Sequence, residues 1–97
     1  MIIRVFQVQV QPGMRGDFER FLREEAIPLL QAQEGLLQFH VGAPMEETPD
    51  EFAVILMWKD PASLQAFTGP KWREAVILPE EAHLLKSTHL HHYQSLF

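Results

Sequence analysis

The sequence predicts an α+β fold of the ferredoxin-like type, because the spacing of its apolar residues switches between the strand period of two and the helical period of about 3.6. Turn residues divide the chain into the order β-α-β-β-α-β, the split βαβ arrangement. Both helices are then expected on one face of a four-stranded antiparallel sheet. The length of 97 residues is usual for one domain, so residues 1–97 are expected to form a single domain.

The first third of the chain predicts a strand followed by a helix. Residues 2–10 are rich in β-branched side chains, and Phe6, Val8 and Val10 alternate with glutamines. The turn "QPGMRGD" follows, with Asp17 as a candidate N-cap. Pro28 is expected to bend the last helical turn or to begin a separate short helix. The apolar stripe of this helix comprises Phe18, Phe21, Leu22, Ala26, Leu29 and Leu30.

The rest of the chain predicts two strands, a helical region and a last strand. Gly35 ends the first helix, and residues 36–41 form the second strand, with Leu37, Phe39 and Val41 on one face. The polar loop "GAPMEETPD" leads to a third strand over residues 51–59. Asp60-Pro61 is a helix start, and Gly69-Pro70 divides the following region into two short helices. Residues 87–94 form the last strand after the linker "LPEEAHLL".

The third strand is apolar on both faces, which predicts a homodimer. Its even-numbered residues from Phe52 to Trp58 are all large and apolar, and Ala53, Ile55 and Met57 face the other way. A strand of this kind is normally covered on both sides. The two helices cover one side only, so a second copy of the chain is expected on the other. The alternative is a monomer with a half-exposed apolar face.

Composition excludes several classes of partner and site. The net charge is −5 and the eight Lys and Arg residues are scattered, so no nucleic-acid partner is expected. The chain contains no cysteine, which excludes disulfides, thiolate metal sites and a thiol nucleophile. No apolar run reaches the roughly 18 residues of a membrane span, and "MIIRVFQVQV" does not read as a signal peptide. A cytoplasmic protein without a membrane partner is therefore expected.

Three stretches carry a resemblance to a known family. They are "QVQPGMRGDFERFL", "QEGLLQFHV" and "MWKDPASLQAF" continued by "KWREAV". In this order and spacing they resemble the antibiotic biosynthesis monooxygenase (ABM) domain, a dimeric α+β barrel. The resemblance implies one of the activities of that family: cofactor-free oxygenation of polycyclic phenols and anthrones, haem degradation, or the conversion of quinols. It supports the fold more directly than any one reaction.

The haem-degrading branch of this family can be compared residue by residue. That branch carries an Asn on the first strand, a Trp on the second helix and an iron-ligating His shortly after it. This sequence has Phe6, Phe67 and Val76 at those positions, and the His that other members carry at the position of Phe67 is also absent. The resemblance therefore implies no cofactor. A haem-binding alternative needs a different ligand, for which His83 is the candidate.

Aromatic residues are the candidate walls of a substrate pocket between helices and sheet. Both tryptophans lie within residues 57–76, with a phenylalanine between them. Packing in the core is the simpler interpretation for several of these rings, and a pocket wall can also be a core residue. The candidates are Phe6, Phe39, Trp58, Phe67 and Trp72.

Histidines are the candidate catalytic bases, since imidazole titrates near neutral pH. His83 in the linker can reach a pocket mouth, and its alternative is an exposed loop residue. His40 on the second strand is expected near the subunit interface. In "THLHHYQ", His89 and His91 share one strand face and provide half of a tetrahedral metal site; the alternative is a plain polar face.

Charged residues add two further expectations. Arg4, the one charge inside the first strand, either binds an anionic substrate group or pairs with an acidic residue, and pairing is the simpler interpretation. Glu80 and Glu81 are expected to be solvated loop charges.

The resulting hypothesis is a small dimeric monooxygenase that acts without cofactor on a flat hydrophobic phenol or quinol. The alternatives are a non-catalytic ligand-binding or regulatory dimer and a haem-binding or haem-degrading protein.

Overall fold

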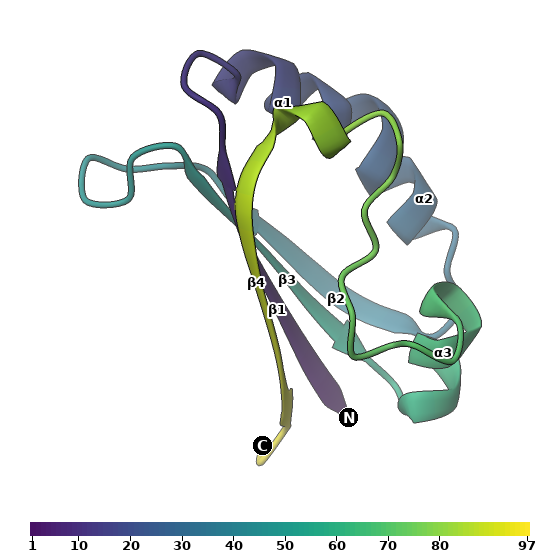
Figure 1. Cartoon of the computed structure of the whole chain (residues 1–97). Helices are drawn as coiled ribbons and strands as arrows, with labels where there is room; N and C mark the ends of the chain where they lie inside the picture. Colours follow the sequence, from purple (N-terminus) through teal and green to yellow (C-terminus); the bar gives the residue numbers. More distant parts are fainter.

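A four-stranded antiparallel sheet with the strand order β2-β3-β1-β4 organises the computed structural model, which describes all residues 1–97. The strands are β1 (Ile2–Val10), β2 (Leu36–Gly42), β3 (Glu51–Trp58) and β4 (Leu85–Gln94). Figure 1 shows the helical segments and the long connection that precedes β4 on one side of this sheet. The predicted ferredoxin-like order is therefore confirmed.

The first helical segment has three consecutive parts: α1 (Arg15–Phe21), a π-helical turn η1 (Leu22–Ala26) and α2 (Ile27–Gln31). The helix begins before Asp17, so the prediction that this residue is the N-cap is wrong; Met14 occupies that position. Pro28 lies in the first turn of α2. This agrees with the second of the two predicted alternatives, in which Pro28 begins a separate short helix. A π-helical turn holds more residues than an α-helical turn, so it changes which of the following residues face the sheet. Leu30 is therefore buried and Leu29 is 39% exposed, which corrects the predicted stripe.

Strand β2 contains a bulge that the sequence did not predict. Its pairing with β3 shifts between Leu36 and Gln38, so that Leu36 lies opposite Trp58. Leu37 is the extra residue and is 55% exposed. The expectation that Leu37 shares a face with Phe39 is wrong, because one extra residue inverts the alternation of a strand.

Helix α3 (Pro61–Thr68) begins where the sequence predicts. The Asp60 side chain accepts a hydrogen bond of 2.8 Å from the Ser63 backbone N–H, and Pro61 occupies the first turn. The helix ends at Gly69, whose φ of 85° favours glycine. The predicted second short helix is wrong: residues 70–74 form turns and a bend, and residues 75–78 have no regular structure. A short 3-10 helix, η2 (Ala82–Leu84), then leads into β4, which starts two residues earlier than predicted.

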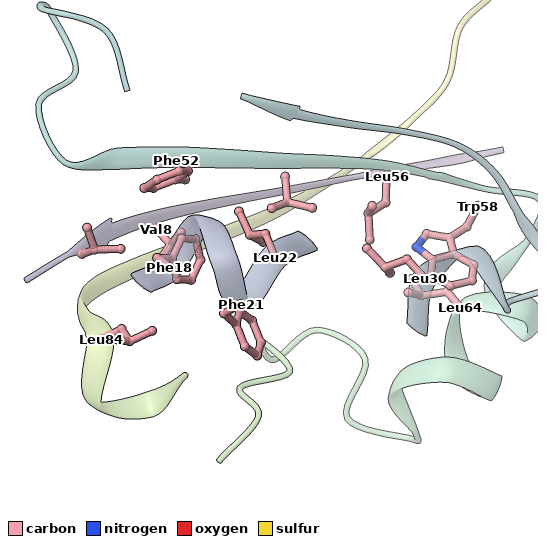
Figure 2. Packing of buried hydrophobic residues seen from close by; sticks show 12 residues of the cluster. Val8, Phe18, Phe21, Leu22, Leu30, Phe52, Leu56, Trp58, Leu64 and Leu84 are labelled. Atoms are coloured by element: carbon pink, nitrogen blue, oxygen red, sulfur yellow. The ribbon is translucent and has the colours of Figure 1, made fainter. Parts of the chain in front are cut away.

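The core fills the space between the sheet and the helical layer (Figure 2). In β3, burial alternates strictly along the strand, with the even-numbered residues from Phe52 to Trp58 buried. The ring of Phe18 lies 4.8 Å from that of Phe52 between centroids, which joins α1 to the sheet. On the opposite, outer face, Ala53, Ile55 and Met57 are only partly covered. None of the helices has the length and apolar character required to cross a membrane.

Candidate functional site

A narrow cavity lies between the helical layer and the sheet. Its walls come from β1, β2, β3, the first helical segment, α3 and the connection before β4, and 14 of the 16 lining residues are hydrophobic. The two exceptions are Arg4 and Glu81. The cavity volume is about 80 Å³. This is well below the ~300–1,000 Å³ of typical ligand sites, so only a small or flat molecule fits unless a wall moves.

Arg4 reaches the interior because it lies on the same face of β1 as Phe6 and Val8, and it is 4% exposed. Its Nη1 donates to the backbone carbonyl of Trp72 and contacts Nε2 of His92 at 2.8 Å. Its Nη2 donates to the carbonyl oxygen of Glu74 at 3.1 Å. Burial lowers the pKa of Arg4. The expected pairing with an acidic residue is wrong, since the only ion pairs lie on the surface of the first helical segment.

Glu81 is buried, so the prediction of a solvated loop charge is wrong for this residue. It is 4% exposed, and its Oε2 accepts a hydrogen bond of 3.0 Å from the Leu78 backbone N–H. Burial is the main cause that raises the pKa of Glu81; the charge of Glu80 adds to the rise and the hydrogen bond opposes it. A carboxylate whose pKa is raised is a stronger base than an ordinary carboxylate and is better suited to accept a proton. No periodicity in the sequence marks it, because its burial depends on how residues 69–84 fold back.

Trp58 lies directly behind the cavity wall. Its side chain is fully buried and stacks on Phe67 with ring centroids 5.5 Å apart. Its indole Nε1 has no hydrogen-bond partner. Figure 2 shows this nitrogen on the side of the ring toward Leu56 and Leu30, both of which line the cavity.

The other predicted aromatic residues take three different places. Phe6 and Phe67 are on the cavity wall. Phe39 instead borders a separate shallow groove between α2 and β2. Trp72 does not line the cavity; its ring meets that of His92 edge-on at 5.0 Å, and the Arg73 guanidinium lies 4.1 Å from its centroid.

The predicted histidines lie outside the cavity. His83 is exposed in η2, and His40 is exposed on the outer face of β2 opposite Ile55. His89 and His91 are exposed and face the same outer side of β4. No group of three or more His, Asp or Glu residues is arranged to hold a metal ion. The fold does not bring these histidines together in one site. Their catalytic and metal-binding roles stay predictions.

Comparison with known proteins gives a family and a set of similar folds. A family model described as "Antibiotic biosynthesis monooxygenase" matches residues 1–76. No curated protein matches the chain.

Among solved structures, a putative antibiotic biosynthesis monooxygenase from Nitrosomonas europaea has a TM-score of 0.78 at 15% identity over 100% of both chains. A protein from Pseudomonas aeruginosa has a TM-score of 0.75 at 21% identity, covering 99% of this chain and 94% of its own. The heme-degrader MhuD from Mycobacterium tuberculosis, with two hemes bound in its active site, has a TM-score of 0.72 at 16% identity, covering 100% and 97%. At these identities the similarity shows the fold.

Proposed function

The chain belongs to the antibiotic biosynthesis monooxygenase family, and from this premise we propose that it is a small oxygenase that acts without a cofactor on a flat hydrophobic phenol or quinol. The observation that carries the proposal is the apolar cavity with one buried carboxyl group, Glu81, in its wall. The base is placed at Glu81 rather than at His83 or His40, because neither histidine lines the cavity.

Glu81 starts the reaction by taking the phenolic proton, so that the O–H bond breaks and a phenolate forms. A phenol of pKa ~10 is a poor acid for an ordinary carboxylate, and the raised pKa of Glu81 narrows that gap. The phenolate passes one electron to O2, and the resulting phenoxyl radical and superoxide combine to form a C–O bond at a ring carbon. Glu81 returns its proton to the peroxide and then accepts the proton of that carbon, while the C–H electron pair forms a second C=O bond and the O–O bond breaks to release hydroxide. Glu81 passes this proton to the hydroxide, which forms water and restores the carboxylate. Phenol and O2 thus yield a quinone and water.

The apolar walls of the cavity protect this sequence of steps from water. Phe6 and Phe67 present ring faces or edges to a flat substrate. A bicyclic phenol is larger than the present cavity, so its binding requires a wall to move. The wall formed by Val76 and Leu78 is the one without regular secondary structure.

We further propose that the protein acts as a homodimer through the outer face of the sheet. Ala53, Ile55 and Met57 on β3 adjoin Ile3 and Val5 on β1 in this face, and none of them is fully buried. No element of the chain covers this surface (Figure 1). A second copy that packs sheet against sheet would remove it from water.

The cavity does not fit haem, although MhuD binds two hemes in a similar fold. Its lining contains no His, Tyr, Met or Cys side chain that could ligate the iron in the usual way. Its volume of about 80 Å³ is also far too small for a porphyrin. No step of the proposed reaction passes through haem, and haem addition is expected to produce no Soret shift.

Oxygen uptake tests the proposal. The wild type is supplied with anthrone-like and quinol-like compounds, and oxygen consumption is followed together with the incorporation of ¹⁸O into the product. Glu81→Gln is expected to lose about 10²–10⁴-fold in rate, the usual contribution of a general base. Glu47→Gln, in an exposed loop, is the matched control and is expected to retain the wild-type rate. If the protein binds these compounds without consuming oxygen, the oxygenase proposal is wrong and the alternative of a non-catalytic ligand-binding dimer takes its place.

A further inference from the structure

Arg4 is a buried cation without a buried anion beside it. It is 4% exposed and forms no ion pair. Glu81 lines the same cavity but is not within ion-pair distance of it, and Glu74 contributes only its backbone carbonyl. A buried charge of this kind is costly unless an opposite charge compensates it. Arg4 therefore lacks the partner that such a position normally requires.

Part of the Arg4 guanidinium is still available for hydrogen bonding. The group carries five N–H donors. Two on Nη1 are directed to the carbonyl of Trp72 and to Nε2 of His92, and one on Nη2 is directed to the carbonyl of Glu74. The donors that remain are Nε–H and the second N–H of Nη2. Nε and Nη2 share one edge of the guanidinium, so a carboxylate can bind Nε–H with one oxygen and take or share an Nη2 donor with the other.

No acidic side chain contacts Arg4. Arg73 stacks on Trp72, and Trp72 contacts His92, which in turn contacts Arg4. The pKa of His92 is lowered, first by burial and then by Arg4, Arg73 and His91. This keeps His92 neutral and able to accept the hydrogen bond from Arg4. Arg4 is therefore the one cationic side chain that lines the cavity.

We propose that the ligand of this cavity is an aromatic carboxylate, a flat apolar ring system whose carboxylate binds to the free edge of Arg4. The inference rests on the proposed function, in that the cavity is the substrate site. A planar carboxylate matches two parallel N–H donors and neutralises one charge. A tetrahedral dianion would bring a second negative charge into a wall that is almost entirely hydrophobic. A neutral phenol would leave Arg4 uncompensated.

The two polar groups also indicate the shape of this ligand. Arg4 lies near the start of β1. Glu81 lies close in sequence to Leu84, and the Leu84 carbonyl accepts a hydrogen bond from the Gln11 N–H, which follows the end of β1. The two residues therefore lie toward opposite ends of β1. The two side chains line the same cavity and do not form an ion pair with each other. An elongated molecule can place its carboxylate at Arg4 and its phenolic hydroxyl toward Glu81. A hydroxylated naphthoate has this form.

Binding of matched ligands tests the inference. Isothermal titration calorimetry compares 6-hydroxy-2-naphthoate with 6-hydroxy-2-naphthamide, which has the same shape without the charge. The wild type is expected to bind the carboxylate at least ten-fold more tightly. Arg4→Met is expected to remove this preference while its affinity for the amide stays within three-fold of the wild type. Arg4→Lys keeps the charge without the two-donor edge and is expected to retain part of the preference. Arg15→Gln, exposed at the start of α1, is the control and is expected to behave as the wild type.

Equal affinity of the wild type for the carboxylate and the amide would overturn the inference, as would a preference that survives in Arg4→Met. The ligand comparison in the wild type decides the question even if Arg4→Met does not fold. The outcome is separable from that of the oxygenase proposal. If the protein prefers the carboxylate but consumes no oxygen, the carboxylate inference stands and the oxygenase proposal fails. If it consumes oxygen but shows no preference, the oxygenase proposal stands and the carboxylate inference fails.

Discussion

Gly35 is the position where the smallest substitution should have the largest structural effect. It precedes β2 and lies against the first turn of α3. A Cβ added there would lie 2.0 Å from Cβ of Ser63 and 2.2 Å from its Oγ. Non-bonded carbon atoms require roughly 3.5–4.0 Å, so Gly35→Ala is short of space by at least about 1.5 Å. A rotation of the Ser63 side chain cannot relieve the clash, because its Cβ is fixed to the backbone.

Helix α3 or the backbone at Gly35 must therefore move, and hydrogen bonds hold both of them in place. The Ser63 N–H is bound by the Asp60 cap, and the Lys59 N–H donates to the Gly35 carbonyl oxygen at 2.9 Å. Overpacking of this kind costs about 1–3 kcal/mol, and the loss of one of these hydrogen bonds adds about 1 kcal/mol. A loss of about 3 kcal/mol in the free energy of unfolding corresponds to a melting temperature lower by roughly 12–24 °C for a chain of this size.

Urea denaturation followed by tryptophan fluorescence measures this loss. Gly42→Ala is the control, because its added Cβ would meet nothing closer than 3.9 Å, and it is expected to stay within about 0.5 kcal/mol of the wild type. In the double variant Gly35→Ala with Ser63→Gly, the nearest remaining atom is the Cα of residue 63 at 3.3 Å. The two substitutions should therefore couple favourably by at least 1 kcal/mol, in the range usual for contacting residues. A Gly35→Ala variant as stable as Gly42→Ala, or purely additive effects in the double variant, would refute this account of the contact.

Three further outcomes are expected. Because burial raises the pKa of Glu81, the folded protein holds this proton more tightly than the unfolded chain. The free energy of unfolding of the wild type should fall relative to Glu81→Gln as the pH rises from about 4 through the raised pKa, and a pH-independent difference in urea titrations would contradict this. Ile55→Lys on the outer face of the sheet should sediment as an 11.2 kDa monomer while the wild type and Gln65→Lys sediment as dimers; identical sedimentation of all three would argue against the interface. Phe18→Ala, 1% exposed in the wild type, should lose about 3–5 kcal/mol in urea denaturation, and a loss below 1 kcal/mol would contradict its place in the core.

The fold could be predicted from the sequence where the deciding interaction is local. The alternation in β3 correctly separated the residues of its two faces, and Asp60 followed by Pro61 located the start of α3 because cap and first turn are adjacent in the chain. Most errors occur at irregular turns or where distant contacts decide, although the N-cap expected at Asp17 is a local error. The π-turn before Pro28 and the bulge at Leu37 each change the count of residues per repeat, and a fixed period cannot represent that change. The connection at residues 70–78 is held instead by hydrogen bonds from the Arg4 side chain of β1 and by its own turns.

The candidate site was predictable only in its apolar part. Phe6 and Phe67 could be named as walls because large rings on the helix-facing sides of their elements must meet between sheet and helices. Trp72 could not be placed, since its position depends on Arg4 and His92, residues 68 and 20 positions away in the chain. The same holds for the two charged lining residues. Glu81 looks like its neighbour Glu80 in the sequence, and only the folded connection buries one and exposes the other.

The separation of Arg4 from Glu81 is the feature that favours a binding site over a structural role. A buried ion pair would satisfy both charges within the protein, and Arg–carboxylate pairs form readily when geometry allows. Here each group is buried and each is held by backbone atoms, yet neither neutralises the other. Keeping both lowers the stability of a small domain, in which apolar side chains of similar volume would be tolerated or even stabilising. Such a cost is typical of groups that a ligand completes, and a carboxylate at Arg4 with a hydroxyl at Glu81 would complete both.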